Sequence, residues 1–359
     1  MIKILPKIGL DVDDVLLSCI PHAIDLANKE YNYCPKLIPE EVTGWGITGR
    51  RSDVILQYFE KESFFKSQPV IEGAQDFVKR LCKMAEVFVI TSIPQKFASI
   101  RIQQILKYFP EIPIENILIG SRKDIVKMDL ILDDGAHNIT KSSATYPVLM
   151  RKPWNRHLSG LLSISRYDDF LHLVKRITTV DKPVNLKQGG VVVLCGPSGS
   201  GKTEFAESLS LKSDKYFLPN TYTTKASSPQ NYISVSSETF YQLKNKGKIT
   251  ESTVYAGFDY GLSLETLEKK IDHGNIGVVK LDICGALTLK QHFSSKCLLV
   301  YVHRSKKDII KNIISNNDLS TDEMTARILS IDSEKKNRCL CDEVWEYTDL
   351  QHIIQNFNE

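Results

Sequence analysis

The sequence has almost no excess charge and no long apolar run. Its 359 residues include 46 Lys and Arg against 43 Asp and Glu, which leaves a net charge of +3. This nearly neutral net charge gives no indication of a nucleic-acid partner, because proteins bind polyanions through clustered positive charge. The longest apolar runs, such as 191–194 and 297–302, are far shorter than the roughly 20 residues that cross a bilayer. We therefore expect no membrane association.

The eight cysteines lack the paired C-x-x-C spacing of a metal or redox motif. Lys3, Lys7 and Asp11 interrupt the N-terminal apolar stretch, which therefore does not have the form of a signal peptide. Both absences favour a reducing, cytoplasmic location with free thiols. With 42% hydrophobic and 25% charged residues and no internal repeat, the composition is that of a folded globular chain.

A polar segment divides the chain into two parts. Residues 178–190 contain a proline and a Gly-Gly pair and show no apolar period, which is typical of a linker. We place the linker at 179–189 and expect domains at 1–178 and 190–359. Each is long enough to bury its own core.

Apolar runs of strand length recur in both parts and alternate with helical patterns. One helical pattern extends from Leu16 to about Tyr31, where Pro21 should start or kink the helix. The alternation predicts the α/β class, with two three-layer domains built on parallel sheets. The predicted strands are 8–12, 87–90, 117–119, 130–132, 147–150 and 160–164 in the first part and 191–194, 277–281 and 298–302 in the second.

Carboxylates follow two of the predicted strands of the first part. They are Asp11, Asp13 and Asp14 after the first strand and Asp133 and Asp134 after the fourth. The carboxyl ends of parallel strands meet at one edge of a sheet, where ligands bind. Several carboxylates together require a cation, and oxygen ligands favour Mg²⁺. The alternative interpretation is that these are ordinary acidic turn residues at strand ends.

Four segments in a fixed order resemble the haloacid dehalogenase superfamily, and within it the 5'(3')-deoxyribonucleotidase-like phosphatases. The resemblance covers about residues 5–175. It implies a Rossmann-like fold with a helical cap inserted at about residues 16–85. The segments are GLDVDDVL at 9–16, FVITSIP at 88–94, Lys123 ahead of LILDDGAHN at 130–138, and YPVLMRKPWNR at 146–156.

This resemblance implies a role for each motif residue. Asp11 would be the nucleophile that forms an aspartyl phosphate, and Asp13 would protonate the leaving alkoxide and later activate water. Thr91 and Lys123 would hold the phosphoryl oxygens and offset their charge. The implied Mg²⁺ ligands are Asp11, the Asp13 backbone carbonyl and one of Asp133 and Asp134, with Asp134 favoured.

Four aromatic residues have two interpretations. Trp45, Phe64 and Phe65 lie in the inserted cap, where they are candidates for stacking on a nucleobase. Packing in a hydrophobic core is the alternative, because aromatic side chains dominate cores. Trp154, in the PWNR segment, has the same two interpretations.

The second part begins with a glycine-rich phosphate-loop motif. GPSGSGKT at 196–203 matches G-x-x-x-x-G-K-[ST] between a predicted strand and a helical pattern, which is the context that the motif requires. Its backbone N–H groups would wrap the β-phosphate of ATP, Lys202 would contact the β- and γ-phosphates, and the Thr203 hydroxyl would ligate Mg²⁺. The predicted ATP-binding residues are Gly196, Ser198, Gly199, Ser200, Gly201, Lys202 and Thr203.

The residues beyond this motif resemble guanylate kinase and its relatives over about 190–357. The resemblance implies a P-loop nucleoside monophosphate kinase fold with ATP as the phosphoryl donor, and Arg327 matches an arginine that stabilises the transferring phosphoryl group. The matching segments include TYTTK at 221–225, KGKITESTVYAGFDYGLS at 246–263 and VVKLDICGA at 278–286. The implied acceptor-binding residues are Thr221, Lys225, Tyr232, Glu251, Tyr260 and Asp282.

The sequence also departs from the guanylate kinase pattern. Lys225 and Ser228 stand where the family has two arginines, which weakens the clamp on the acceptor phosphate. Lys280 replaces the first acid of a D-I-D segment, and Asn312 and Asn316 lie where arginines line the donor ATP. The acceptor is therefore predicted to differ from plain GMP.

Together the two parts predict a bifunctional enzyme that hydrolyses one (deoxy)nucleoside monophosphate and phosphorylates another. Three alternatives are a polynucleotide 3'-phosphatase and 5'-kinase, a sugar-phosphate kinase in the second domain, and a non-catalytic guanylate kinase-like binding module. The near-neutral charge counts against the first, and Glu251 and Asp282, which suit a base edge, count against the second. The retained Lys202 and Thr203 count against the third.

Overall fold

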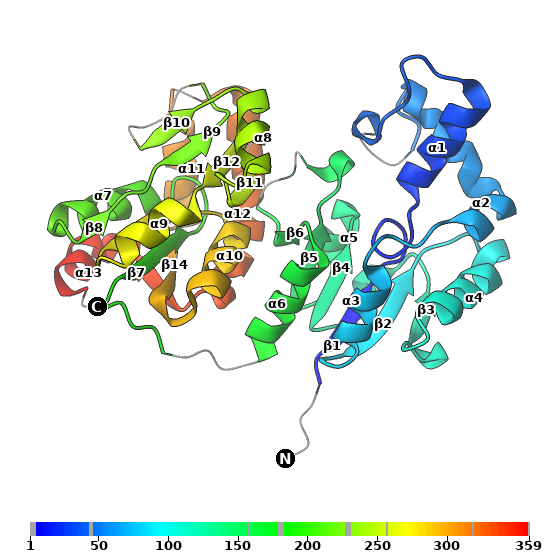
Figure 1. Ribbon diagram of the computed structural model, residues 1–359, viewed down its shortest axis with the longest axis horizontal. Helices are drawn as coiled ribbons and strands as arrows, with labels where there is room; N and C mark the ends of the chain where they lie inside the picture. The colour runs from blue at the N-terminus through cyan, green and yellow to red at the C-terminus, as the bar shows by residue number, and fades with distance from the viewer. Residues whose placement is uncertain are drawn as a thin grey trace. The chain divides into compact units, whose positions relative to one another are not determined.

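The computed structural model describes residues 5–42, 46–156, 158, 160–178, 183–226, 231–255, 258–317 and 319–357. It divides into two compact units, Met1–Arg156 with Ser163–Thr178 and His157–Leu162 with Thr179–Glu359. The short segment 157–162 thus groups with the second unit, whereas the sequence analysis placed it in the first domain. Both units are α/β domains built on parallel sheets, as predicted (Figure 1).

The first unit is built on a six-stranded sheet in which every neighbouring pair is parallel, in the order β3-β2-β1-β4-β5-β6. All six strands coincide with predicted apolar runs, although the last is shorter than predicted. Apolar runs mark such strands because helices bury both faces of a parallel sheet. The strands are β1 (Lys7–Leu10), β2 (Glu86–Thr91), β3 (Ile117–Ile119), β4 (Leu130–Asp133), β5 (Tyr146–Met150) and β6 (Ser163–Ile164).

The first helix begins at Ile20, four residues later than the predicted start at Leu16. Asp14 adopts a left-handed conformation (φ 56°), and the backbone turns at Val12, whose carbonyl accepts from the N–H of Leu16 at 2.8 Å. Both carboxylate oxygens of Asp14 then accept the first N–H groups at the helix start, each at 2.9 Å. The helical spacing from Leu16 therefore extends too far, because this acidic turn precedes the helix. The expectation that Pro21 could start the helix is confirmed, since Pro21 lies in its first turn. The helices are α1 (Ile20–Tyr31), α2 (Glu62–Ser67), α3 (Ala74–Leu81), α4 (Ala98–Tyr108), α5 (Ala136–Lys141) and α6 (Tyr167–Thr178).

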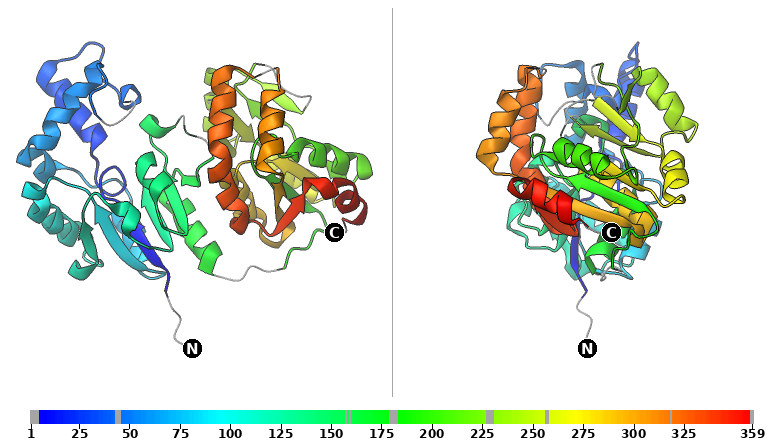
Figure 2. Two further views of the ribbon diagram at one scale, coloured as in Figure 1. Left: turned by 180° about the vertical axis from the view of Figure 1, so that it is seen from behind. Right: turned by 90° about the vertical axis from the view of Figure 1, so that its left-hand side faces the viewer.

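The segment between β1 and β2 forms a helical cap with its own core. Helices α1 and α2 and the 3-10 helix η2 (Arg51–Glu60) gather at one end of the sheet (Figures 1 and 2). Phe64 and Phe65 are buried in this core, and Trp154 joins it. These three aromatic residues therefore pack in a core, whereas Trp45 lies outside the described residues. The α3 helix is not part of this cap. It packs against α6, where Phe77 stacks on Tyr167 with ring centres 4.4 Å apart.

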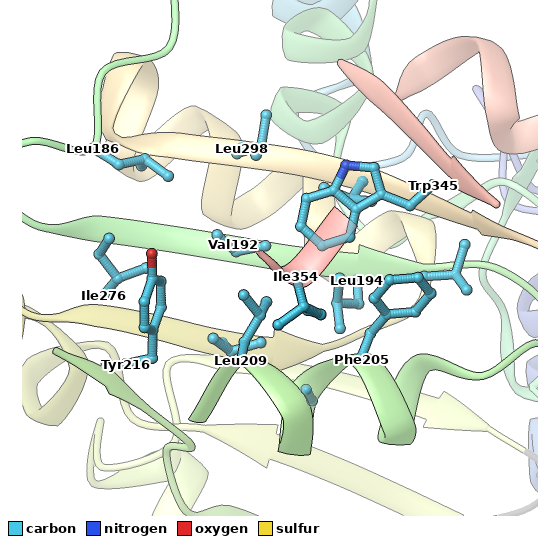
Figure 3. Close-up of a cluster of buried hydrophobic side chains, with 14 residues drawn as sticks. Leu186, Val192, Leu194, Phe205, Leu209, Tyr216, Ile276, Leu298, Trp345 and Ile354 are labelled. Atoms are coloured by element: carbon cyan, nitrogen blue, oxygen red, sulfur yellow. The ribbon is translucent and has the colours of Figure 1, made fainter. Parts of the chain in front are cut away.

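The second unit contains a five-stranded, fully parallel sheet in the order β15-β14-β7-β13-β8. Phe205 and Leu209 of α7 point toward Val192 and Leu194 of β7, and Phe205 lies 5.5 Å from the Trp345 ring (Figure 3). The strands are β7 (Gly190–Cys195), β8 (Tyr216–Phe217), β13 (Ile276–Lys280), β14 (Cys297–His303) and β15 (Glu343–Glu346). The helices around them are α7 (Lys202–Lys212), α9 (Leu264–Ile271), α10 (Ile283–Phe293), α11 (Lys306–Ile314), α12 (Thr321–Lys336) and α13 (Leu350–Asn356).

A second, four-stranded sheet of mixed direction lies in the same unit, in the order β10-β9-β12-β11. Its strands do not coincide with predicted apolar runs, because they are short and partly exposed. They are β9 (Thr221–Thr223), β10 (Tyr232–Ser234), β11 (Glu251–Tyr255) and β12 (Phe258–Leu262), with α8 (Ser237–Asn245) between β10 and β11. Elsewhere in the unit, α11 and α12 pack side by side through buried isoleucines (Figure 2).

Two further observations concern the whole described chain. None of the eight cysteines, all of which lie within the described residues, forms a disulfide. Among the described residues, no helix has the length and apolar character needed to cross a membrane.

The contact between α3 and α6 makes a prediction for stability. Phe77→Ala should lower the free energy of unfolding of the first unit by about 3–5 kcal/mol, since it leaves a cavity under the Tyr167 and Phe170 rings. Urea unfolding followed by circular dichroism measures this loss. The control, Ile114→Ala at a 60% exposed site, should change stability by less than about 0.5 kcal/mol. Equal losses in the two variants would contradict the packing described.

Candidate active sites

Three buried carboxylates converge at the carboxyl edge of the first sheet. Asp11 follows β1, Asp133 is the last residue of the adjacent parallel strand β4, and Asp134 follows it. One oxygen from each of these side chains lies within 4.8 Å of the others, and all three residues are buried. The structure thus brings together the acids that the sequence analysis assigned to one site.

Lys123 joins two of these acids. Its Nζ lies 2.7 Å from Asp11 Oδ1 and 2.7 Å from Asp133 Oδ2, and the side chain is buried. Burial alone would lower the pKa of Lys123, but the two carboxylates outweigh it and raise the pKa above the usual lysine value. The lysine therefore remains charged and holds the two acids together.

The two acids after β4 have different surroundings. Asp133 accepts hydrogen bonds from Lys123, from the Gly135 N–H at 2.7 Å and from Asn138 Nδ2 at 3.0 Å. Within the described part of the chain, only the Trp154 indole N–H, at 2.8 Å, hydrogen-bonds the Asp134 side chain. Asp134 therefore keeps an oxygen available for a further ligand.

The electrostatics of this group fit a divalent cation. Burial raises the pKa of Asp11 to about 7, with Asp133 and Asp13 adding to the rise. Burial and the neighbouring carboxylates raise the pKa of Asp134 well above its usual range. A Mg²⁺ ion would offset both effects, because it supplies positive charge and prefers oxygen ligands. The residues present therefore fit this metal.

Asp13 is held by two side chains that the sequence analysis missed. Arg101 on α4 donates through Nη2 to both Asp13 oxygens, at 2.8 and 2.9 Å, and is fully buried. Gln68 donates to Asp13 Oδ1 at 2.8 Å. A signal for Arg101 was present, because it lies four residues before the buried Ile105 on the apolar face of a helical pattern.

Thr91 ends β2, the strand that pairs with β1 on the side away from β4. Its hydroxyl is fully buried and finds no hydrogen-bond partner among the described residues. A buried hydroxyl without a partner is costly, so this atom is placed to accept or donate to a bound ligand.

In the second unit the phosphate loop connects β7 to α7. Gly196, Gly199 and Gly201 have φ values of 125°, 79° and 107°, in the region that glycine adopts freely. A Cβ added at Gly201 would lie 2.1 Å from the Tyr347 ring, so only glycine fits there. The Lys202 ammonium donates to the Gly196 carbonyl at 2.5 Å, and burial lowers its pKa. The loop therefore has the strand–turn–helix context that the motif predicts.

Side chains from other elements contact this loop. Arg327 Nη1 donates to Ser198 Oγ at 2.7 Å, and Asn312 Nδ2 donates to the Gly199 carbonyl at 3.0 Å. The Ser200 hydroxyl is buried without a partner in the described ranges. Arg327, which the resemblance assigned to the transferring phosphoryl group, therefore contacts the phosphate loop.

The surroundings of Thr203 do not fit a metal held by the protein. In P-loop enzymes an acid at the end of a neighbouring strand helps to hold Mg²⁺ beside this hydroxyl. Here the ammonium of Lys280, at the end of β13, donates to Thr203 Oγ1 at 3.4 Å. A cation in this position opposes the binding of a second cation at the hydroxyl.

The four-stranded sheet presents the predicted acceptor-binding residues. Thr221, Tyr232 and Tyr260 lie on three of its strands, and the two tyrosine rings meet edge to face at 6.2 Å. Glu251 on β11 is buried, and its Oε2 has no partner within the described residues. Burial, with a smaller contribution from Asp282, raises the pKa of Glu251 to about 8.

Asp282 has a different role from Glu251. Its Oδ1 accepts from the Gly285 N–H at 2.9 Å and caps α10, and its Oδ2 accepts from Thr253 Oγ1 at 2.5 Å. Both oxygens are therefore already engaged. Of the two acids predicted at the acceptor base, Glu251 is the one whose carboxyl is available to a ligand. Ser228 lies outside the described residues.

These sites define a chain with two phosphoryl-transfer domains, one of the carboxylate-dependent phosphatase class and one of the P-loop kinase class. Residues 4–179 match the family "5' nucleotidase, deoxy (Pyrimidine), cytosolic type C protein", and residues 188–359 match the guanylate kinase family. The chain is a fusion of an N-terminal deoxynucleotidase domain of the haloacid dehalogenase superfamily with a C-terminal guanylate kinase domain.

Individual relatives match one half each. A 5'(3')-deoxyribonucleotidase of Bacillus subtilis (strain 168) is 28% identical over 169 residues, which cover 45% of this chain and 94% of the relative. A guanylate kinase of Helicobacter pylori (strain ATCC 700392 / 26695) is 28% identical over 174 residues, 47% of this chain and 82% of the relative. The crystal structure of guanylate kinase from Anaplasma phagocytophilum has 20% identity and a TM-score of 0.38 and covers 46% of this chain and 81% of that one.

The contact between Arg101 and Asp13 makes a prediction for the phosphatase domain. Arg101→Met should lower phosphatase kcat by about 100-fold, because Asp13 loses the guanidinium that fixes its position. Steady-state phosphate release measures this loss. The control, Lys107→Met, removes an exposed positive charge from the same helix and should leave kcat unchanged. Equal rates for the two variants would show that Arg101 does not position Asp13.

The buried Glu251 makes a prediction for pH. Glu251 ionises near 4.5 in the unfolded chain and near 8 in the native one. Between pH 4.5 and pH 8, Glu251 is protonated in the native state and ionised in the unfolded state. The free energy of unfolding therefore falls as pH rises, by up to about 1.4 kcal/mol per pH unit. Glu251→Gln should flatten this fall in urea unfolding between pH 5 and pH 8. Glu238→Gln, an exposed control on α8, should leave the slope unchanged, and equal slopes for all three proteins would contradict the assignment.

Proposed function

We propose that this chain is a bifunctional enzyme of nucleotide metabolism. Its first domain hydrolyses a (deoxy)nucleoside monophosphate with Mg²⁺, and its second transfers a phosphoryl group from ATP to a different nucleoside monophosphate. The observation that carries the proposal is the presence in one chain of the buried carboxylate group with Lys123 and the glycine-built phosphate loop. The two substrates differ in this proposal, because a phosphatase acting on the kinase's acceptor would convert it to a nucleoside and withdraw it from the second domain.

In the first domain, Asp11 acts as the nucleophile. Its Oδ1 accepts from the Val12 N–H and from Lys123, both at 2.7 Å, whereas no described residue hydrogen-bonds Oδ2. An Asp11 oxygen forms a bond to phosphorus while the bond from phosphorus to the ester oxygen breaks. Lys123 and the Thr91 hydroxyl hold the phosphoryl oxygens and offset their negative charge.

Asp13 carries the proton in both half-reactions. It donates a proton to the leaving nucleoside oxygen, and later removes one from the water that attacks the aspartyl phosphate and releases Asp11. Arg101 and Gln68 fix its carboxyl group for this exchange. The Mg²⁺ that offsets phosphate charge would be held by Asp11, the Asp13 backbone carbonyl and Asp134, because Asp133 is already occupied by Lys123, Gly135 and Asn138.

In the second domain, the phosphate loop binds ATP. Its backbone N–H groups and the α7 N-terminus face the β-phosphate, and Lys202 moves from the loop carbonyls to the β- and γ-phosphates. Arg327, already at Ser198, is placed to stabilise the phosphoryl group during transfer.

The acceptor binds between the four-stranded sheet and the phosphate loop. In this proposal Lys225 and Thr221 hold the acceptor phosphate, and Tyr232 and Tyr260 offer an aromatic surface to the base. Glu251 meets the edge of the base. With a pKa of about 8, its carboxyl is largely protonated at neutral pH and therefore offers both a donor and an acceptor.

Two variants separate the activities. Asp11→Asn should lower phosphate release by about a thousandfold or more and leave ADP formation intact, because it removes only the nucleophile of the first domain. Lys202→Ala should abolish ADP formation and leave phosphate release intact. Phosphate and ADP are measured over a panel of ribo- and deoxyribonucleoside monophosphates.

The panel also tests the alternatives. Turnover of oligonucleotides with 3'-phosphate or 5'-hydroxyl ends, in place of mononucleotides, would overturn the proposal. Unchanged ATP consumption by Lys202→Ala would contradict the assignment of the donor site. Absence of turnover by both domains across the panel would exclude the bifunctional enzyme.

A further inference from the structure

The carboxylate of Glu323 lies between two cations of the kinase domain. Its Oε1 is 2.8 Å from Lys225 Nζ and 3.8 Å from Arg327 Nη2. The three side chains are only 15–18% exposed. Lys225 follows β9, and Glu323 and Arg327 lie one turn apart on α12, so a single oxygen connects two distant parts of the domain.

These two cations are the ones assigned above to phosphate groups. Lys225 belongs to the acceptor phosphate, and Arg327, which also donates to Ser198, belongs to the transferring phosphoryl group. Carboxylate and phosphate oxygens accept the same charge-assisted hydrogen bonds from Lys and Arg. Glu323 therefore offers these cations what a bound phosphate would offer.

Capping of α12 does not account for this arrangement. The other oxygen of Glu323, Oε2, accepts from the Ser320 N–H at 3.2 Å and closes a capping box at the start of the helix. A glutamine can make the same capping contact, so the cap does not require a negative charge. The hydrogen bond from Lys225 lowers the pKa of Glu323, which is therefore ionised at neutral pH.

We propose that Glu323 occupies the place of the acceptor phosphate in the resting kinase domain and competes with phosphate-bearing ligands for Lys225 and Arg327. The proposal rests on the kinase function proposed above. It makes Glu323 a specificity-determining residue, because a ligand must displace its carboxylate to reach the two cations.

The consequence is discrimination between whole nucleotides and small anions. A tethered carboxylate competes at an effective concentration in the millimolar range or above, so inorganic phosphate at similar concentrations displaces it poorly. A nucleoside monophosphate has additional contacts, through its base to Glu251 and the tyrosine pair. Those contacts allow it to displace Glu323, and free phosphate lacks them.

Glu323→Gln tests this inference, because it removes the charge and keeps the cap. The KM for the acceptor nucleotide should fall by about tenfold, while kcat stays within about threefold of the wild type. Inorganic phosphate at millimolar concentration should become a competitive inhibitor against the acceptor. It should also raise the melting temperature of the variant more than that of the wild type, which is a readout without turnover.

Asp322→Asn is the matched control. It removes one negative charge from the same first turn of α12 at an exposed side chain. Its KM and its response to phosphate should equal those of the wild type. This comparison separates a local effect of Glu323 from a general change in the charge of the helix end.

The outcomes distinguish this inference from the proposed function. An unchanged or raised KM in Glu323→Gln, without inhibition or stabilisation by phosphate, would show that Glu323 only positions Lys225 and would overturn the inference. If no nucleotide is phosphorylated by the wild type or the variant, the proposed kinase function fails. Stabilisation of the variant alone by phosphate would then still support the inference, and equal stabilisation of both proteins would overturn it.

Discussion

The ammonium of Lys123, 2.7 Å from both Asp11 and Asp133, is the interaction on which the phosphatase site depends. Parallel strands direct their carboxyl ends to one edge, and here that edge collects several buried acids whose mutual repulsion burial intensifies. Positive charge from other elements offsets the repulsion: Lys123 follows β3, and Arg101 on α4 pairs with Asp13. The site is therefore built by charge compensation between segments that are distant in sequence.

The kinase site follows the same principle with the signs reversed. A site for phosphate concentrates cations, and in the absence of phosphate these cations need acceptors of their own. Lys202 donates to loop carbonyls, whereas Lys225 and Arg327 share the carboxylate of Glu323. Under the proposed function, substrate binding in this domain is thus an exchange of one set of acceptors for another, and affinity depends on the difference between them. Lys280 beside Thr203 adds a cation where P-loop enzymes place an acid.

The sequence was sufficient for features with a local physical signature. Strands buried on both faces are continuous apolar runs, and the phosphate loop requires glycines at fixed spacing because their φ values are positive. Contacts that depend on tertiary packing had no signature that identified both partners, even where a helical pattern marked one of them as buried. Arg101 reaches Asp13 across 88 residues, and Glu323 reaches Lys225 across 98. Pro21 marked the start of α1, whereas the acidic turn before it, in which Asp14 accepts from the Cys19 and Ile20 N–H groups, had no local signature.

Helix capping also separates the two acids that the sequence analysis treated as equivalent in the acceptor site. The carboxylate of Asp282 is fully used by α10 and Thr253, so its position follows from local structure and leaves it little freedom to respond to a ligand. Glu251 has no such duty, and burial shifts it toward the neutral form. In the proposed function, recognition of the base therefore falls to the one carboxyl group that both donates and accepts. In that proposal the residue pairs with a base edge that offers both a donor and an acceptor, and the pairing weakens above pH 8, where the carboxylate is an acceptor only.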